Sequence, residues 1–114
     1  MSSPTDAVLD RELALTRVGG DAELLREIAV LFLEDYPQSL AEIREALDRG
    51  DAHKIERTAH GLKGSVANFG AANAVSAAKQ IENLGRAKQL EEVGAVLVTL
   101  ELALATLRPE LEAL

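Results

Sequence analysis

Apolar residues recur at intervals of three and four along most of this chain, which is the spacing of amphipathic helices. The longest series is Leu25, Ile28, Phe32, Tyr36, Leu40, Ile43 and Leu47. Two more consist of Ile55, Ala59, Leu62, Val66 and Phe69, and of Val93, Leu97, Leu100, Leu104, Leu107 and Leu111. A weaker series is Val75, Ala78, Ile81 and Leu84. Narrow stripes of this kind predict helices that pack side by side and nearly antiparallel.

Glycine and aspartate separate these series, and both residue types are typical of helix ends. The clearest signals are Gly19-Gly20-Asp21 and Gly50-Asp51, and two further glycines, Gly70 and Gly85, follow the last apolar residues of two series. Together they predict a short helix beginning near Val8 and four longer helices within 21–50, 51–69, 71–85 and 93–111. Short connections then predict an all-α fold, an antiparallel up-down-up-down four-helix bundle with a short extra N-terminal helix across one end. We expect residues 1–6 to be a disordered lead-in and residues 7–114 to form a single domain.

Two prolines fall inside the predicted helices, where proline removes a backbone hydrogen bond and clashes with the preceding turn. At Pro37 the apolar stripe continues in phase from Tyr36 to Leu40, which favours one kinked helix. Two consecutive helices are the alternative. Pro109 raises the same question for the last helix, which could fray after Arg108.

Charge and composition narrow the classes of function. The chain has 12 Lys and Arg against 19 Asp and Glu, a net charge of -7 that disfavours binding to nucleic-acid phosphates. Without cysteine it has no disulfides and no thiolate metal sites. The longest apolar stretch, 95–107, contains Glu101 and is too short to span a membrane, and the first residues do not resemble a signal peptide. We therefore expect a cytoplasmic protein without a membrane segment, and a monomer, because nothing in the sequence demands a dimer.

Both histidines lie in the segment from 51 to 69, and the helical wheel places His60 roughly 140° from the centre of the apolar stripe, facing water. Gly64 costs the helix about 1 kcal/mol relative to alanine, but it clears space beside that imidazole. Lys63 adds a mobile ammonium of the kind that binds phosphate. These residues fit a site that accepts a phosphoryl group and admits another protein. From these residues alone, a merely solvated histidine explains His60 equally well.

A metal site and a nucleotide site are not expected. His53 is two turns from His60, about 10 Å along the helix axis, too far for both to bind one metal ion. We interpret His53 as a surface residue at the rim of a partner's footprint. The sequence has no phosphate-binding loop and no glycine-rich loop of a kinase, so we expect neither ATP binding nor self-phosphorylation.

The stretch from 59 to 71 reads AHGLKGSVANFGA. It resembles the signature of histidine-containing phosphotransfer (HPt) domains, His-x-Leu-Lys-Gly-Ser, four residues and then Gly-Ala, at every fixed position. Other stretches that are similar to family features are Gly19-Gly20-Asp21, Leu31-Phe32-Leu33-Glu34, Tyr36-Pro37, Gly50-Asp51 and Ile81-Glu82. The resemblance extends from about Leu9 to Leu107.

The resemblance implies roles for four residues. His60 would accept a phosphoryl group from a receiver-domain aspartate and pass it to another receiver. Lys63 would neutralise charge on the phosphoryl oxygens, and Gly64 would give the partner access. Glu82 would accept the Nδ1–H of the imidazole and leave Nε2 as the nucleophile; the alternative is a solvated glutamate near a helix end.

The remaining residues of the motif have no expected part in the chemistry. Gly61 occupies a variable position, and Ser65 and Asn68 are interpreted as packing or hydrogen-bonding residues.

The resemblance therefore implies a phosphocarrier in a multistep histidine–aspartate relay, without autonomous kinase activity and without a cofactor of its own. Its expected partners are the receiver domains of response regulators or hybrid histidine kinases, and Mg²⁺ is expected on the receiver. Apolar surface from the first helix and from the helices near His60 would meet the receiver. One alternative is the phosphotransfer domain of a chemotaxis-type kinase, phosphorylated by a separate ATP-binding domain. Another is a helical adaptor that is never phosphorylated.

Overall fold

The computed structural model describes residues 9–114, so the predicted lead-in at 1–6 and the first residues of the predicted domain lie outside it. The elements are α1 (Arg11–Arg17), α2 (Ala22–Arg49), α3 (Ala52–Ala67), α4 (Ala72–Ala87), a 3-10 turn η2 (Leu90–Glu92) and α5 (Val93–Glu112). Within 9–114 there is no strand, which confirms the predicted all-α class. No helix in this range is long and apolar enough to cross a membrane.

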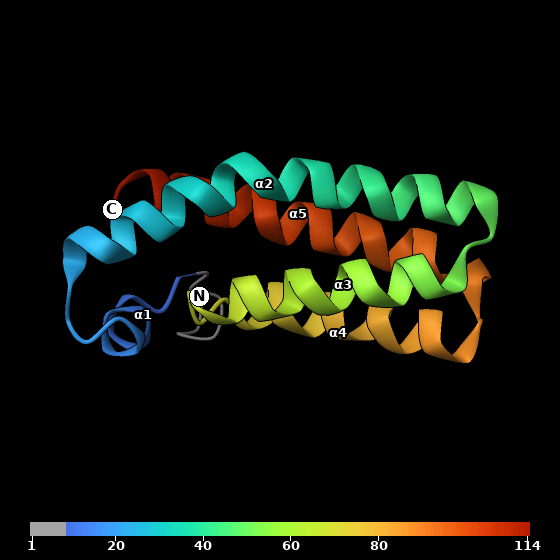
Figure 1. Cartoon of the computed structure of the whole chain (residues 1–114), viewed down its shortest axis with the longest axis horizontal. Helices are drawn as coiled ribbons and strands as arrows, with labels where there is room; N and C mark the ends of the chain where they lie inside the picture. The colour runs from blue at the N-terminus through green and yellow to red at the C-terminus, as the bar shows by residue number, and fades with distance from the viewer. Residues whose placement is uncertain (1–8) are drawn as a thin grey trace, which may run out of the picture.

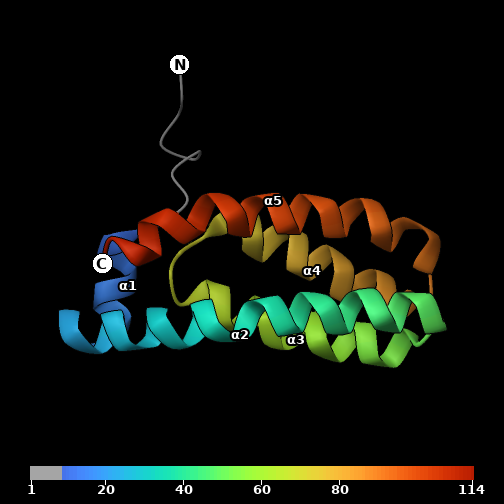
Figure 2. The same cartoon turned by 90° about the horizontal axis from the view of Figure 1, so that it is seen from above.

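The four long helices run alternately up and down, and α1 lies across the end where α2 begins and α5 ends (Figures 1 and 2). Around the bundle, α2 packs against α3 and α5, and α4 packs against the same two helices. The most extensive of these contacts is between α3 and α4. The predicted antiparallel bundle with its extra N-terminal helix is therefore confirmed.

Aspartates cap three of the helices. The side chains of Asp10, Asp21 and Asp51 each accept a hydrogen bond from the backbone N–H three residues on, at 3.0–3.1 Å. The helix predicted to begin near Val8 begins instead at Arg11. Asp10 is its N-cap, and the backbone N–H of Asp10 donates to the carbonyl of Phe69 at 2.9 Å, which holds Asp10 against the segment that follows α3.

Gly85 does not end a helix, contrary to the prediction. α4 continues to Ala87, and Lys88 takes the left-handed C-cap conformation with φ of 60°. Gly85 is buried against the backbone of α3, where a Cβ would lie 2.9 Å from the backbone nitrogen of Glu56. The glycine therefore serves close helix packing and not termination.

Both prolines are accommodated inside continuous helices. α2 runs unbroken through Pro37, so the alternative of two helices is wrong. Just before the proline, Tyr36 stacks on Phe32, one turn earlier in the helix, with ring centroids 5.3 Å apart. α5 likewise continues past Pro109 to Glu112, and the fraying expected after Arg108 is not observed because Leu111 is buried in the core.

Candidate functional site

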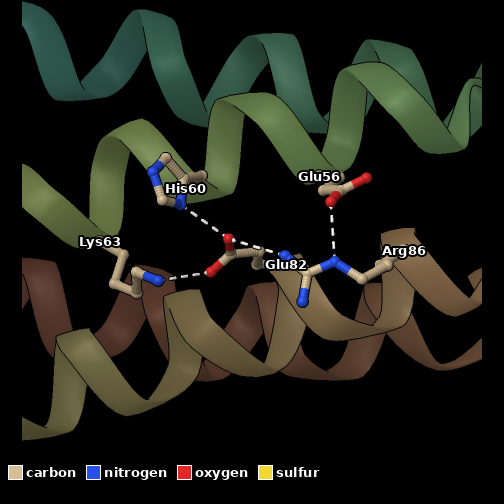
Figure 3. Close-up of polar contacts among 5 residues, drawn as sticks. All are labelled: Glu56, His60, Lys63, Glu82 and Arg86. Carbon is tan, nitrogen blue, oxygen red and sulfur yellow. Dashed lines mark hydrogen bonds and ion pairs between the residues drawn. The ribbon is translucent and has the colours of Figure 1, made fainter.

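His60 lies on the outer face of α3, as the helical wheel predicts. Its neighbours Ala59 and Leu62 are buried in the bundle, and this fixes the rotation of the helix. The His60 side chain is 67% exposed. The helix therefore presents the imidazole to solvent, with one ring edge turned towards α4 (Figure 3).

Glu82 is the buried centre of the site. It comes from α4, its side chain is only 6% exposed, and it lies between three cationic or polar donors (Figure 3). Oε2 is 2.7 Å from Nδ1 of His60, Oε1 accepts from Nζ of Lys63 at 2.7 Å, and Oε2 also accepts from Arg86 at 3.2 Å. A buried carboxylate needs such partners, because burial without them carries a large desolvation penalty. The alternative of a solvated Glu82 is wrong.

The charge state of Glu82 determines the state of the imidazole. The hydrogen bond from Lys63 lowers the pKa of the Glu82 carboxyl below its usual value, burial opposes this, and His60 lowers it further. The carboxyl is therefore ionised at neutral pH and can only accept hydrogen bonds. Nδ1 of His60 must carry the proton that it donates, which leaves the Nε2 lone pair free in the neutral ring.

Lys63 does not stand free beside His60. Its side chain is 28% exposed, and its ammonium is bound to the same carboxylate as the imidazole. The structure thus brings His60, Lys63 and Glu82 together, with Lys63 one turn from His60 along α3. A cation in this position balances the charge of the buried carboxylate.

The glycines of the motif leave the surface beside His60 open. A Cβ at Gly61 or Gly64 would meet no atom within 4 Å, so packing inside this chain requires neither glycine. Ser65 donates to the carbonyl of Gly61 at 3.2 Å, and Asn68 is the C-cap of α3. Both therefore make local helix contacts.

Glu56 and Arg86 belong to the site, although the sequence did not suggest them. Arg86 donates through Nε to Glu56 at 2.9 Å and reaches Glu82 with its other end. The only signal in the sequence is spacing, since Glu56 precedes His60 by four residues and Arg86 follows Glu82 by four. That these two pairs face each other depends on the register between α3 and α4, which no pattern within one helix contains.

His53 lines a shallow hollow next to this network, together with Glu56, Arg57, His60, Glu82 and Arg86. Over residues 9–114, no three side chains of the metal-binding types are grouped so that they could hold an ion. Every buried side-chain nitrogen and oxygen in the same range has a hydrogen-bond partner. Within the network of Glu56, His60, Lys63, Glu82 and Arg86, the imidazole is the most exposed side chain.

Comparison with known proteins points to one family. The model of the Hpt domain matches residues 27–110. The structure is similar to the crystal structure of histidine-containing phosphotransfer protein B (HptB) from Pseudomonas aeruginosa PAO1, with a TM-score of 0.86 and 25% sequence identity. That match covers 98% of this chain and 95% of the other. No curated protein sequence matches this one.

Proposed function

We propose, from the premise that this chain belongs to the Hpt domain family, that His60 is the residue that carries its phosphoryl group. The chain is a phosphocarrier in a histidine–aspartate phosphorelay. The assignment of His60 rests on its geometry, an exposed imidazole whose Nδ1 lies 2.7 Å from the ionised Glu82. A ring held in this way presents the lone pair of Nε2 to an approaching protein.

In the proposed transfer, Nε2 of His60 attacks the phosphorus of a phosphorylated receiver aspartate. The bond between phosphorus and the aspartate oxygen breaks, and its electron pair returns to the carboxylate. No proton has to leave the ring, because Nδ1 keeps its hydrogen and the phosphorylated imidazole becomes a cation. Glu82 stabilises that cation through the hydrogen bond to Nδ1. Transfer to a second receiver reverses these steps.

Lys63 is the proposed counter-charge for the phosphoryl oxygens. Its flexible four-carbon stem allows the ammonium to move from Glu82 to a phosphoryl group on the neighbouring turn of α3. Gly64 would leave the receiver free to approach, since its surface is open. This chain therefore supplies the nucleophile, the cation and the access, without a kinase activity or a cofactor of its own.

The proposed partners are receiver domains of response regulators or hybrid histidine kinases. The receiver would hold the Mg²⁺. This chain would act as a monomer in the cytoplasm. The receivers would dock transiently over the outer face of α3. Leu13 of α1 and Leu24 at the start of α2 are partly exposed, at 38% and 40%. Leu13 also lies near Gly70, just beyond α3, so it adds apolar surface at the end of that helix.

The test is transfer of a labelled phosphoryl group from a phosphorylated receiver domain to the wild type, His60→Gln and His53→Gln. His53 is the matched control, since it is the other histidine of α3 and lines the same hollow. We expect the wild type and His53→Gln to take up a label that is lost in acid and kept in alkali. His60→Gln should take up none.

Three results would contradict parts of this proposal. Label on His60→Gln would show that another residue is the acceptor. A cognate receiver that binds but transfers nothing would replace the carrier by a helical adaptor. Label that appears only after addition of an ATP-binding kinase domain would identify the phosphotransfer domain of a chemotaxis-type kinase.

A further inference from the structure

Gly85 is a buried glycine of α4 that lies directly against the backbone of α3. A Cβ at this position would be 2.9 Å from the nitrogen of Glu56, 3.0 Å from the carbonyl oxygen of Ala52 and 3.2 Å from the Cα of Glu56. All three are backbone atoms, which cannot rotate aside as a flexible side chain can. Any side chain at Gly85 must therefore move the two helices apart.

The other helical glycines do not share this environment. A Cβ at Gly61 or Gly64 would meet nothing within 4 Å, and one at Gly94 would meet only the side chain of Leu47, at an ordinary 3.9 Å. A glycine inside a helix destabilises it relative to alanine. At Gly85, close approach to α3 is the physical reason for accepting that cost.

This close approach lies one helical turn from the reactive imidazole. Gly85 stands between Glu82 and Arg86 on α4, and its contact residue Glu56 precedes His60 by one turn on α3. The distance of 2.7 Å between Nδ1 and Oε2 is at the short end for a charge-assisted hydrogen bond. The Glu56–Arg86 ion pair crosses between the helices at the same level. A wider separation here would stretch both contacts.

We propose that Gly85 is a positioning residue for the phosphotransfer site, because its missing side chain sets the separation of α3 and α4 at which Glu82 reaches Nδ1 of His60. The inference rests on the proposed role of His60 as the nucleophile. Without the acceptor at Nδ1, the neutral ring shifts towards the form protonated on Nε2. In that form Nε2 has no free lone pair with which to attack phosphorus.

The tautomer of His60 is the readout, observed by ¹⁵N NMR of the unphosphorylated protein at alkaline pH. Gly94→Ala is the matched control, a second glycine-to-alanine change inside a helix of the bundle. Wild type and Gly94→Ala should show a protonated Nδ1 and an unprotonated Nε2. Gly85→Ala should shift towards protonated Nε2, in the direction expected for Glu82→Ala, which removes the acceptor altogether, and should slow phosphoryl uptake on the order of tenfold.

A double variant separates positioning from a general effect on packing. If Gly85 acts through Glu82, adding Gly85→Ala to Glu82→Ala changes the tautomer no further than Glu82→Ala alone. Should Gly85→Ala fold poorly, it is measured in the Gly94→Ala background, where replacing an unneeded helix glycine adds stability.

A folded Gly85→Ala protein with the wild-type tautomer would overturn the proposal. Failure to fold in both backgrounds would also overturn it, because Gly85 would then serve the fold and not the site. The proposed function is tested separately by the receiver assay, because the tautomer measurement involves no phosphoryl group. A normal tautomer in a protein that accepts no label would therefore reject the carrier role and leave the tautomer measurement valid.

Discussion

The two halves of the bundle bury different side chains. On the face of α4, the buried residues include alanines and a glycine, namely Ala74, Ala77, Ala78 and Gly85. On α5, they are mostly leucines, namely Leu97, Leu100, Leu104, Leu107 and Leu111. At Gly85 the missing side chain lets the backbone of α4 lie close to that of α3, beside the polar contacts of Glu82 and Arg86. Leucines remove more apolar surface from water. The comparison indicates that the α3–α4 pair positions the chemistry and that α5 supplies a large part of the stability.

The largest effect should come from the leucine half. Leu104→Ala removes a side chain that is 1% exposed, and it should lower the free energy of unfolding by about 2–5 kcal/mol. Chemical denaturation measures this loss. At temperatures where the variant stays folded, its rate of phosphoryl uptake per folded molecule should match the wild type. If Leu104→Ala instead slowed phosphoryl uptake per folded molecule, the assignment of stability to α5 and of the polar site to α3 and α4 would be contradicted.

A smaller effect on stability, with a strong effect on function, should come from Glu82. At neutral pH Glu82→Gln should cost about 1–3 kcal/mol, because buried donors lose a charged acceptor. The pKa of Glu82 is lowered below its ordinary value of 4.5 in the folded protein. Its contribution is therefore fully present above that value and is lost as the pH falls through the lower folded pKa. Unfolding measured from pH 7 to pH 2 should show wild type and Glu82→Gln converging in acid, and a constant difference would contradict this.

The smallest effect is expected at the ion pair of the α2–α5 half. Arg44 contacts Glu101 at 2.7 Å on the surface, with side chains 50% and 35% exposed. Water and salt screen such a pair, so Arg44→Gln should cost about 0.2–1 kcal/mol and should leave phosphoryl uptake unchanged. A double-mutant cycle with Glu101→Gln isolates the coupling energy between Arg44 and Glu101. A coupling energy as large as that between Lys63 and Glu82 would remove the contrast between surface and buried networks.

Helix content and the outward direction of His60 could be predicted from the sequence because both depend on local spacing. The resemblance of the 59–71 stretch to HPt domains is confirmed by the family match over 27–110. The prediction that a helix ends at Gly85 is wrong. In a sequence, a glycine that follows an apolar residue looks the same whether it ends its helix or packs against a second helix. The helix ends at Arg11 and Glu112 also depend on contacts with distant segments.

The partners within the site were harder to predict. The resemblance implied that Glu82 would approach the imidazole, but the binding of Lys63 and Arg86 to the same carboxylate depends on how α4 is rotated against α3. The contact of Glu56 with Arg86 joins residues 30 positions apart in the chain. Sequence spacing within one helix carries no information on such a register.

The sharing of Glu82 by His60 and Lys63 has a consequence for the energy balance of transfer. Before the proposed transfer, Lys63 and Arg86 both neutralise the buried carboxylate, and the attacking imidazole is uncharged. In the proposed transfer, the lysine would move to the phosphoryl group while the imidazole becomes a cation and takes over part of that neutralisation. The charge of Glu82 would thus be compensated both before and after the proposed transfer. In that mechanism neither state leaves an unpaired buried charge, which suits a carrier that both accepts and donates its phosphoryl group.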